Sequence, residues 1–299
     1  MKALWAIGVE KKYHRKMMLN YLTLGHVQNC VNKDETFFEE IYSLPPAHYC
    51  YLKPTQKQAA KITKYWSIDK EIKIEISESD AVEKFNELFI TAVSRRLRSD
   101  VPLGASLSGG IDSSTIVTII NPIQKNNPGE LKTFSAVFPG FENDESEHIN
   151  LFRKSAGVNN YQVEPSADDL IRDFEKLCYH QEEPFQSSGI YAQYKVYKLA
   201  KQNNITVLLD GQGADETLAG YTRYIHWYLQ EVLSRHKLGA TEIEKSAFRK
   251  NGQQFRWDFK NFMAAFLPAH AAMQLEKREY LKTINHPAIS AGFLEFVRG

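Results

Sequence analysis

The stretch that decides the fold is Ser106–Ser114, which reads SLSGGIDSS and joins an apolar, strand-like segment to an apolar, helix-like one. A turn of this kind leaves backbone N–H groups unpaired at the positive end of a helix dipole, where they attract an anion. Gly109 and Gly110 let the backbone approach a ligand closely because neither has a Cβ. Asp112 would repel that anion unless a cation lay between them, and Mg²⁺ suits such a position. The stretch predicts a pyrophosphate and magnesium site.

Two common phosphate-binding loops are excluded by the sequence. The chain contains no Gly-Lys dipeptide, so it has no G-x-x-x-x-G-K-S/T loop, and it contains no G-x-G-x-x-G dinucleotide fingerprint. A serine- and glycine-rich turn without any ligand remains the alternative interpretation of residues 106–114.

A second strand-to-helix turn has similar chemistry. The apolar, β-branched run 205–209 is typical of a buried strand, and it leads into DGQGADETLAGY at Asp210–Tyr221. Acidic residues at a helix start also suit the helix dipole alone, so a capping role is the simpler alternative. In a parallel sheet, both turns would meet at the carboxyl edge of the strands, where α/β proteins bind ligands.

Together the two turns resemble a known family. The first resembles the S-G-G-x-D-S pyrophosphate loop of the ATP pyrophosphatases, and the pair is similar to the synthetase domain of the glutamine-hydrolysing asparagine synthetases. Relatives with that domain include the β-lactam synthetases and amide-forming enzymes of surface-polysaccharide pathways. The resemblance runs from about residue 21 to about residue 233, with supporting matches at 44–49, 64–66, 133–138, 144–146 and 180–185.

The resemblance implies an ATP-dependent ligase that adenylates a small carboxylic acid for attack by ammonia and releases AMP and pyrophosphate. Adenine would be bound through the backbone of Ala136–Phe138, and Leu107 and Leu209 would flank the base or the ribose. The residues implied to hold ATP are Ser106, Leu107, Ser108, Gly109, Gly110, Asp112, Ser113, Ser114, Ala136, Val137, Phe138, Leu209 and Gly211.

The same resemblance implies that Asp112 and Asp215 hold Mg²⁺, and that Gln212 and Asp215 act in catalysis. The family has Glu at the position of Gln212, and an amide can form hydrogen bonds but cannot act as a general base. The acceptor, aspartate or another acid, is therefore open. The family's glutaminase cysteine directly follows the initiator methionine, whereas this chain has Lys2 there. We therefore expect residues 1–75 to be a remnant of a glutaminase domain with its linker, and residues 76–299 to be a partial synthetase domain.

A second functional hypothesis also stays open. The family has a lysine that stabilises the adenylation transition state, and no lysine in the tail lies in a recognisable context for it. The tail lysines in question are Lys237, Lys245, Lys277 and Lys282. The chain could therefore be a catalytically incomplete fragment that binds ATP or a partner subunit without turnover.

The composition is that of an ordinary globular protein. The 299 residues are 43% hydrophobic and 24% charged, and a net charge of +1 gives no electrostatic case for nucleic acid or membrane as a partner. Three scattered cysteines fit a reducing compartment, and no apolar run approaches the ~20 residues of a membrane span. We expect a cytoplasmic protein whose partners are ammonia and a small carboxylate. A partial domain would also leave apolar surface uncovered and self-associate.

Alternating strands and helices predict a doubly wound parallel sheet flanked by helices, the adenine nucleotide α-hydrolase-like fold that the resemblance also implies. Ser166 is expected to cap one helix and Gly157 to end another. The aromatic stripe on the helix after Gly220 is expected to be buried. Helices are expected at 80–98, 112–120, 145–156, 167–180, 189–203 and within 237–299, and strands at 49–52, 104–108, 131–138, 160–164 and 205–209.

Overall fold

The computed structural model divides into two compact units. Unit 1 is Met1–Asp210 with Glu295–Gly299, and unit 2 is Gly211–Leu294. This division does not coincide with the expected boundary near residue 75, which stays a prediction about the origin of the two parts. The structure describes residues 1–53, 61–124, 131–142, 144–218, 220–235, 238–287 and 289–298, so Lys237 lies outside the described residues.

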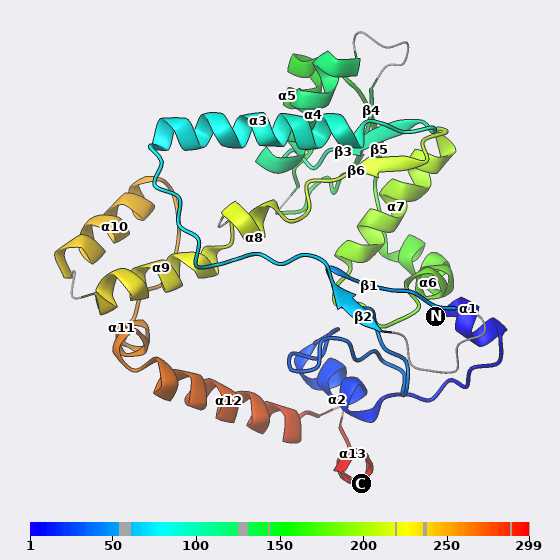
Figure 1. The fold of residues 1–299 in the computed structure, drawn as a ribbon, viewed down its shortest axis with the longest axis vertical. Helices are drawn as coiled ribbons and strands as arrows, with labels where there is room; N and C mark the ends of the chain where they lie inside the picture. Colours follow the sequence, from blue (N-terminus) through cyan, green and yellow to red (C-terminus); the bar gives the residue numbers. More distant parts are fainter. Residues whose placement is uncertain are drawn as a thin grey trace. The chain divides into compact units, whose positions relative to one another are not determined.

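Unit 1 is built on a four-stranded parallel sheet with the strand order β5-β4-β3-β6 (Figure 1). From β3 the chain moves outward to β4 and then β5, and it later returns to place β6 on the other side of β3. The winding therefore reverses between β3 and β6, and their carboxyl ends form the edge where open α/β sheets bind ligands. The strands are β3 (Leu103–Ser106), β4 (Lys132–Ala136), β5 (Asn159–Val163) and β6 (Val207–Leu209).

Helices cover both faces of this sheet, which confirms the predicted doubly wound architecture. On one face, Leu107 packs with Ile120 and Ile149 in a core that α3, α4 and α5 complete. On the other face, Phe134 packs against Val196 of α7, and α6 packs against α7. The helices are α3 (Glu78–Arg96), α4 (Ile111–Gln124), α5 (Ser146–Ala156), α6 (Ala167–Gln181) and α7 (Gly189–Gln202).

Local sequence signals explain where these elements begin and end. The Ser166 side chain accepts the N–H of Asp169 at the start of α6, and Gly157 ends α5 with a left-handed φ of 63°, both as predicted. Ser77 caps α3 in the same way as Ser166 caps α6. In β3, a Cβ on Gly104 would lie 2.8 Å from the carbonyl oxygen of Lys132, so only glycine allows β3 and β4 to pair there.

Residues 1–42, here called the N-terminal layer, have a small core of their own. Met17 and Phe37 are fully buried in this core, together with Phe38 and Ile41. Beyond the layer, an antiparallel pair of short strands includes the strand expected at 49–52, although it begins one residue earlier. The elements of this part are α1 (Lys2–Ala6), α2 (Arg15–Leu24), β1 (His48–Cys50) and β2 (Ile62–Lys64).

Unit 2 is helical in its described residues, as the sequence predicts for the tail. The expectation of a buried aromatic stripe on α9 is wrong for Trp227 and Tyr228, which are 58% and 43% exposed. The inward face of α9 is instead formed by Leu229 and Leu233, four residues apart, and the rings of the stripe lie beside it. The helices are α8 (Ala214–Leu218), α9 (Thr222–Ser234), α10 (Leu238–Lys250), α11 (Phe259–Phe266) and α12 (Pro268–Ile284), with α13 (Ala291–Arg298) across the unit boundary.

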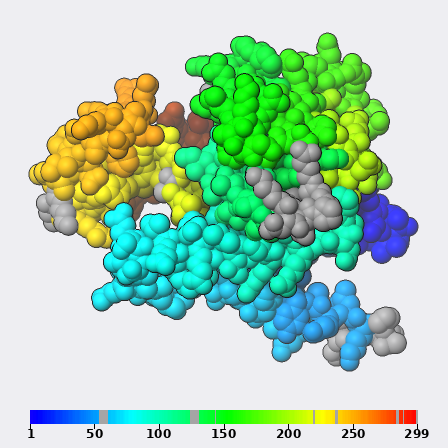
Figure 2. All heavy atoms as spheres, turned by 90° about the horizontal axis from the view of Figure 1, so that it is seen from above, coloured from blue at the N-terminus to red at the C-terminus, as the bar shows by residue number. Residues whose placement is uncertain are grey.

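The first half of α3 leaves apolar side chains uncovered. Val82, Phe85 and Leu88 are each about half exposed or more, and α3 lies at the surface in cyan in Figure 2. Only the second half of α3 reaches the core, through Val93. In the part of the chain that the structure describes, no helix is both long enough and apolar enough to cross a membrane.

Candidate nucleotide site

The turn after β3 is held in place by its own hydroxyl groups. The Ser113 Oγ accepts the backbone N–H of Ser108 at 3.1 Å and lies 3.0 Å from the Ser108 Oγ. It also lies 3.3 Å from the carbonyl oxygen of Gly110, to which it can donate, and the Ser108 Oγ accepts the Gly110 N–H. Because Ser113 is buried, the turn is ordered before any ligand binds, which lowers the entropic cost of binding.

The N–H groups that remain lie where the sequence predicts an anion site. Ser114 N–H bonds to the Gly110 carbonyl and begins the regular ladder of α4. Among the described residues, the backbone N–H groups of Gly109, Ile111, Asp112 and Ser113 have no hydrogen-bond partner. Three of these groups stand at the N-terminus of the 14-residue helix α4, where the helix dipole is positive. A phosphate group is the ligand that such an arrangement favours.

Gly109 is fixed against the start of α5. Its φ of 87° is strained for any residue with a side chain, and a Cβ there would lie 3.1 Å from His148 Cβ and 3.1 Å from Ile149 N. Asp144 holds the preceding turn, since its Oδ1 accepts the N–H of Phe138 and the hydroxyl of Ser146. These hydrogen bonds lower the pKa of the Asp144 carboxyl below its usual value. The N-terminus of α5 is thereby placed beside the turn after β3.

The two aspartates predicted to hold Mg²⁺ lie in different units, Asp112 in unit 1 and Asp215 in unit 2, and their shared role stays a prediction. Asp112 is half-buried in the first turn of α4, and Asp215 is half-buried in α8. Among the described residues, neither carboxylate forms a hydrogen bond or an ion pair, so both can act as ligands. Two carboxylates with phosphate oxygens and water are a donor set that Mg²⁺ prefers. The described residues contain no cluster of three or more histidine, cysteine or acidic side chains that could bind a metal by itself.

Several residues predicted to contact the nucleotide lie in the sheet and the cores. Leu107 is 1% exposed, and its backbone bonds to the carbonyl of Phe134 and the hydroxyl of Ser135. Val137 is buried and its N–H bonds to Val163, while the N–H of Phe138 bonds to Asp144. These residues therefore form the buried base of the carboxyl edge of the sheet. Their predicted direct contacts with the base remain predictions, as do those of Ser106, Ala136 and Leu209.

The strand β6 brings a further carboxylate to the same edge. Leu209 pairs with Ala105 of β3, so Asp210 follows at the level of Ser106, where the first turn begins. The Tyr197 hydroxyl donates to Asp210 Oδ2 at 3.0 Å and accepts from Gln193 Nε2 at 3.0 Å. Burial and the neighbouring Asp210 raise the pKa of Tyr197 to about 12. The phenol therefore stays a hydrogen-bond donor that orients the end of β6.

The remainder of the second motif lies in unit 2. Gly213 has a φ of 95°, with nothing within 4 Å of the place where a Cβ would lie, and Gln212 is exposed. A Cβ on Gly220 would collide with Asp215 Oδ1, so the carboxylate rests directly against this glycine. The Tyr221 hydroxyl donates to Glu216 at 2.7 Å and lowers the pKa of that carboxyl. Gly211, which is half-buried, begins this turn.

Sequence reasoning missed three positioning residues. Asp144 and Gly220 both lie in motifs that were recognised, but their hydrogen bond and close contact depend on the chain folding back over several residues. Tyr197 lies one helix away from Asp210 and carries no motif. Of these three residues, only Gly220 offered a signal in the sequence, which is its position five residues after Asp215.

These features define a class of protein. It is an α/β protein with a hydrogen-bonded turn, rich in unpartnered N–H groups, at the point where the winding of a parallel sheet reverses. Comparison with known proteins gives the family. Residues 84–296 match the family described as asparagine synthase, which is more than half of the chain. The chain belongs to the asparagine synthase family.

Curated relatives agree with this assignment. The chain is 30% identical over 220 residues to a putative asparagine synthetase (glutamine-hydrolysing) 2 of Methanocaldococcus jannaschii, covering 69% of the chain and 41% of that protein. It is 32% identical over 154 residues to asparagine synthetase (glutamine-hydrolysing) 1 of Bacillus subtilis, covering 50% of this chain and 23% of that protein. It is also 28% identical over 203 residues to amidase chry2 of Gibberella zeae, covering 63% and 30%. The chain spans less than half the length of these relatives.

Solved structures give weaker similarities. An NH3-dependent NAD synthetase from Campylobacter jejuni aligns with a TM-score of 0.33 at 14% identity, covering 70% of this chain and 98% of that one. The U34-tRNA thiolase NcsA from Methanococcus maripaludis aligns with a TM-score of 0.34 at 14% identity, covering 73% and 78%.

Proposed function

We propose that this chain is the ATP-using part of an amide-forming ligase, which activates a small carboxylic acid as an acyl-adenylate and transfers it to ammonia. The observation that carries the proposal is the ordered turn Ser108–Ser113 at the carboxyl end of β3, in a member of the asparagine synthase family. Its four unpartnered N–H groups match the oxygens of a pyrophosphate.

In the proposed reaction, the chain acts mainly by positioning and by neutralising charge. The acceptor carboxylate attacks the α-phosphorus of ATP, and the pyrophosphate leaves into the turn after β3. Ammonia then attacks the acyl carbon, and AMP leaves. Mg²⁺ held by Asp112 and Asp215 would neutralise the phosphate charge. The N–H groups of Gly109 and Ile111 donate to the leaving pyrophosphate, and Asp144 keeps the start of α5 against the turn.

We propose that the acceptor is an acid other than aspartate. Gln212 is an exposed amide in the turn where the family has an acid, so it can recognise an acceptor by hydrogen bonds but cannot remove a proton. The similarity to a protein named an amidase as well as to asparagine synthetases is consistent with a varied acceptor. We also propose a reducing, cytoplasmic setting, because the three cysteines Cys30, Cys50 and Cys178 are free thiols.

The test is acid-dependent exchange of labelled pyrophosphate into ATP, which detects adenylation without needing ammonia. Aspartate and a panel of sugar acids serve as acceptors, with the Asp112→Asn variant as the control. Exchange that requires one acid, and that Asp112→Asn abolishes, is the expected result. Binding of Mg·ATP without exchange for any acid would favour the alternative, a nucleotide-binding fragment without turnover. Strong exchange with aspartate alone would overturn the choice of acceptor.

A further inference from the structure

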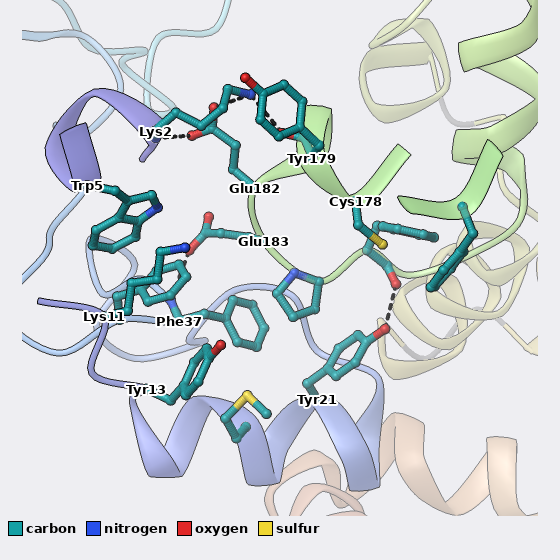
Figure 3. A pocket seen from close by; sticks show the side chains of 15 residues that line it. Lys2, Trp5, Lys11, Tyr13, Tyr21, Phe37, Cys178, Tyr179, Glu182 and Glu183 are labelled. Carbon is teal, nitrogen blue, oxygen red and sulfur yellow. Dashed lines mark hydrogen bonds and ion pairs between the residues drawn. The ribbon is translucent and has the colours of Figure 1, made fainter. Parts of the chain in front are cut away.

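A cavity lies between the N-terminal layer and the end of α6, and none of its lining residues belongs to the turns after β3 and β6. Its volume is about 940 Å³, at the upper end of the range for small-molecule sites. Figure 3 shows side chains from both sides pointing into it. The walls are mostly aromatic, with Trp5, Tyr13 and Phe37 from the N-terminal layer and Phe174 and Phe185 from α6 and the loop after it.

Four charged side chains line this cavity, and two of them, Lys2 and Glu182, form an ion pair. The Lys2 Nζ lies 2.6 Å from Glu182 Oε1 and also donates to the carbonyl of Tyr179 at 2.7 Å. Glu182 further accepts the backbone N–H of Lys2 at 3.1 Å. These donors lower the pKa of the Glu182 carboxyl to about 2. The Met1 ammonium also lies 2.5 Å from Glu182 Oε2, so this carboxylate pairs with two cations of the N-terminal layer and joins that layer to the end of α6.

The other two charges, Lys11 and Glu183, are not satisfied in this way. Lys11 is exposed, its ammonium stands 5.5 Å from the centre of the Trp5 ring, and it has no acidic partner within ion-pair distance among the described residues. Glu183 is half-buried, and Phe37 N–H donates to its Oε1 at 2.9 Å. No cation pairs with Glu183 among the described residues, so a half-buried negative charge has a single backbone donor.

We propose that this cavity binds a free α-amino acid with a large apolar side chain. The ligand's ammonium pairs with Glu183, its carboxylate pairs with Lys11, and its side chain lies among the aromatic walls. A zwitterion satisfies both charges at once, because Lys11 and Glu183 line one cavity without contacting each other. A ligand without an ammonium would leave the half-buried Glu183 with its single backbone donor, and a ligand without a carboxylate would lose the attraction of the exposed Lys11.

This binding would be independent of the nucleotide turn, so it can be measured without ATP. The probe is L-phenylalanine, titrated into the full chain by calorimetry. The matched ligands are 2-phenylethylamine, which lacks the carboxylate, and 3-phenylpropionate, which lacks the ammonium. We expect one site for L-phenylalanine and at least about tenfold weaker binding of each analogue, since each loses one charged contact. Absence of L-phenylalanine binding, or equal affinity for all three ligands, would overturn the proposal.

Two variants test which residue pairs with the ammonium and which pairs with the carboxylate of the ligand. Lys11→Met should lower the affinity for L-phenylalanine to that for 2-phenylethylamine, and it should leave the affinity for 2-phenylethylamine unchanged. Glu183→Gln should abolish the difference in affinity between L-phenylalanine and 3-phenylpropionate, which lacks the ammonium. The amide oxygen of the glutamine can still accept the Phe37 N–H and hold the loop. Lys16→Met, at an exposed lysine of α2 outside the cavity, is the control and should bind like the unmodified chain. An effect of Lys16→Met equal to that of Lys11→Met would reduce the result to general surface charge and contradict the proposal.

Discussion

The turns after β3 and β6 use the same residue types but are built differently. In the first, Ser108 and Ser113 close a network of hydrogen bonds, and Gly109 packs against α5. In the second, Gly213 has open space around it and Gln212 is exposed. The difference indicates a division of labour. Under the proposed function, the ordered turn would bind the phosphates, which every reaction of this kind shares, and the open turn would bind the acceptor, which varies.

The largest expected effect concerns the carboxylate of the ordered turn. Asp112→Asn should weaken Mg·ATP binding at least about tenfold, since an amide gives the metal a neutral ligand in place of a charged one. Thermal stability should change little, because the Asp112 carboxylate has no partner among the described residues. Asp100→Asn, at an exposed position, serves as the control in the same titration. Equal affinity of both variants would remove Asp112 from the site.

The two positive-φ glycines test the difference in order directly. Gly109→Ala should destabilise the fold by about 2–4 kcal/mol, because backbone strain adds to contacts at 3.1 Å with α5. Gly213→Ala should lower the free energy of unfolding by only about 1 kcal/mol, because backbone strain alone acts there. Urea midpoints followed by circular dichroism give both numbers. If the two variants lose the same stability, the first turn is no more tightly packed than the second.

Gly220 offers a test inside the open turn. Gly220→Ala should force the Asp215 carboxylate out of its position, and acid-dependent exchange should fall several-fold with little loss of stability. Gly239→Ala in α10, where nothing lies within 4 Å, should leave exchange intact and raise stability by up to about 1 kcal/mol. Unchanged exchange in Gly220→Ala would show that the orientation of Asp215 does not matter.

The smallest effect concerns the attachment of the N-terminal layer. Because its pKa is lowered to about 2 in the folded chain, the Glu182 carboxylate stabilises the fold above pH 4.5, and that contribution is lost as the pH falls from 4.5 towards 2. Glu182→Gln should therefore lower the urea midpoint at pH 6, and the difference from the unmodified chain should vanish near pH 2. Glu10→Gln, at an exposed side chain, is the control. A difference that persists at pH 2 would mean that the charge of Glu182 is not the cause.

The sequence predicted the architecture of the sheet because its signals are local. Apolar strands, the cap at Ser166 and the left-handed Gly157 each depend on a few neighbouring residues, and each was confirmed. The contacts that orient the site were not predictable in this way. The Tyr197–Asp210 hydrogen bond and the contact of Gly220 with Asp215 arise only when the chain folds back on itself.

The N-terminal layer shows the same limit. Nothing in the sequence indicated that Phe37 would bond to Glu183, 146 residues away, or that Glu182 would bond to the backbone of Lys2. The prediction that the aromatic stripe on α9 is buried was wrong for a related reason. Helical spacing places Trp227 and Tyr228 on neighbouring faces, but only packing decides that Leu229 and Leu233 form the inward one.

The most direct test of the central claim is a calorimetric titration of Mg·ATP into the unmodified chain. The ordered turn after β3, with its unpartnered N–H groups at the start of α4, predicts a single site per chain whose affinity falls when inorganic pyrophosphate is added as a competitor. Absence of any heat of binding at millimolar Mg·ATP, with the chain folded as judged by circular dichroism, would contradict the account.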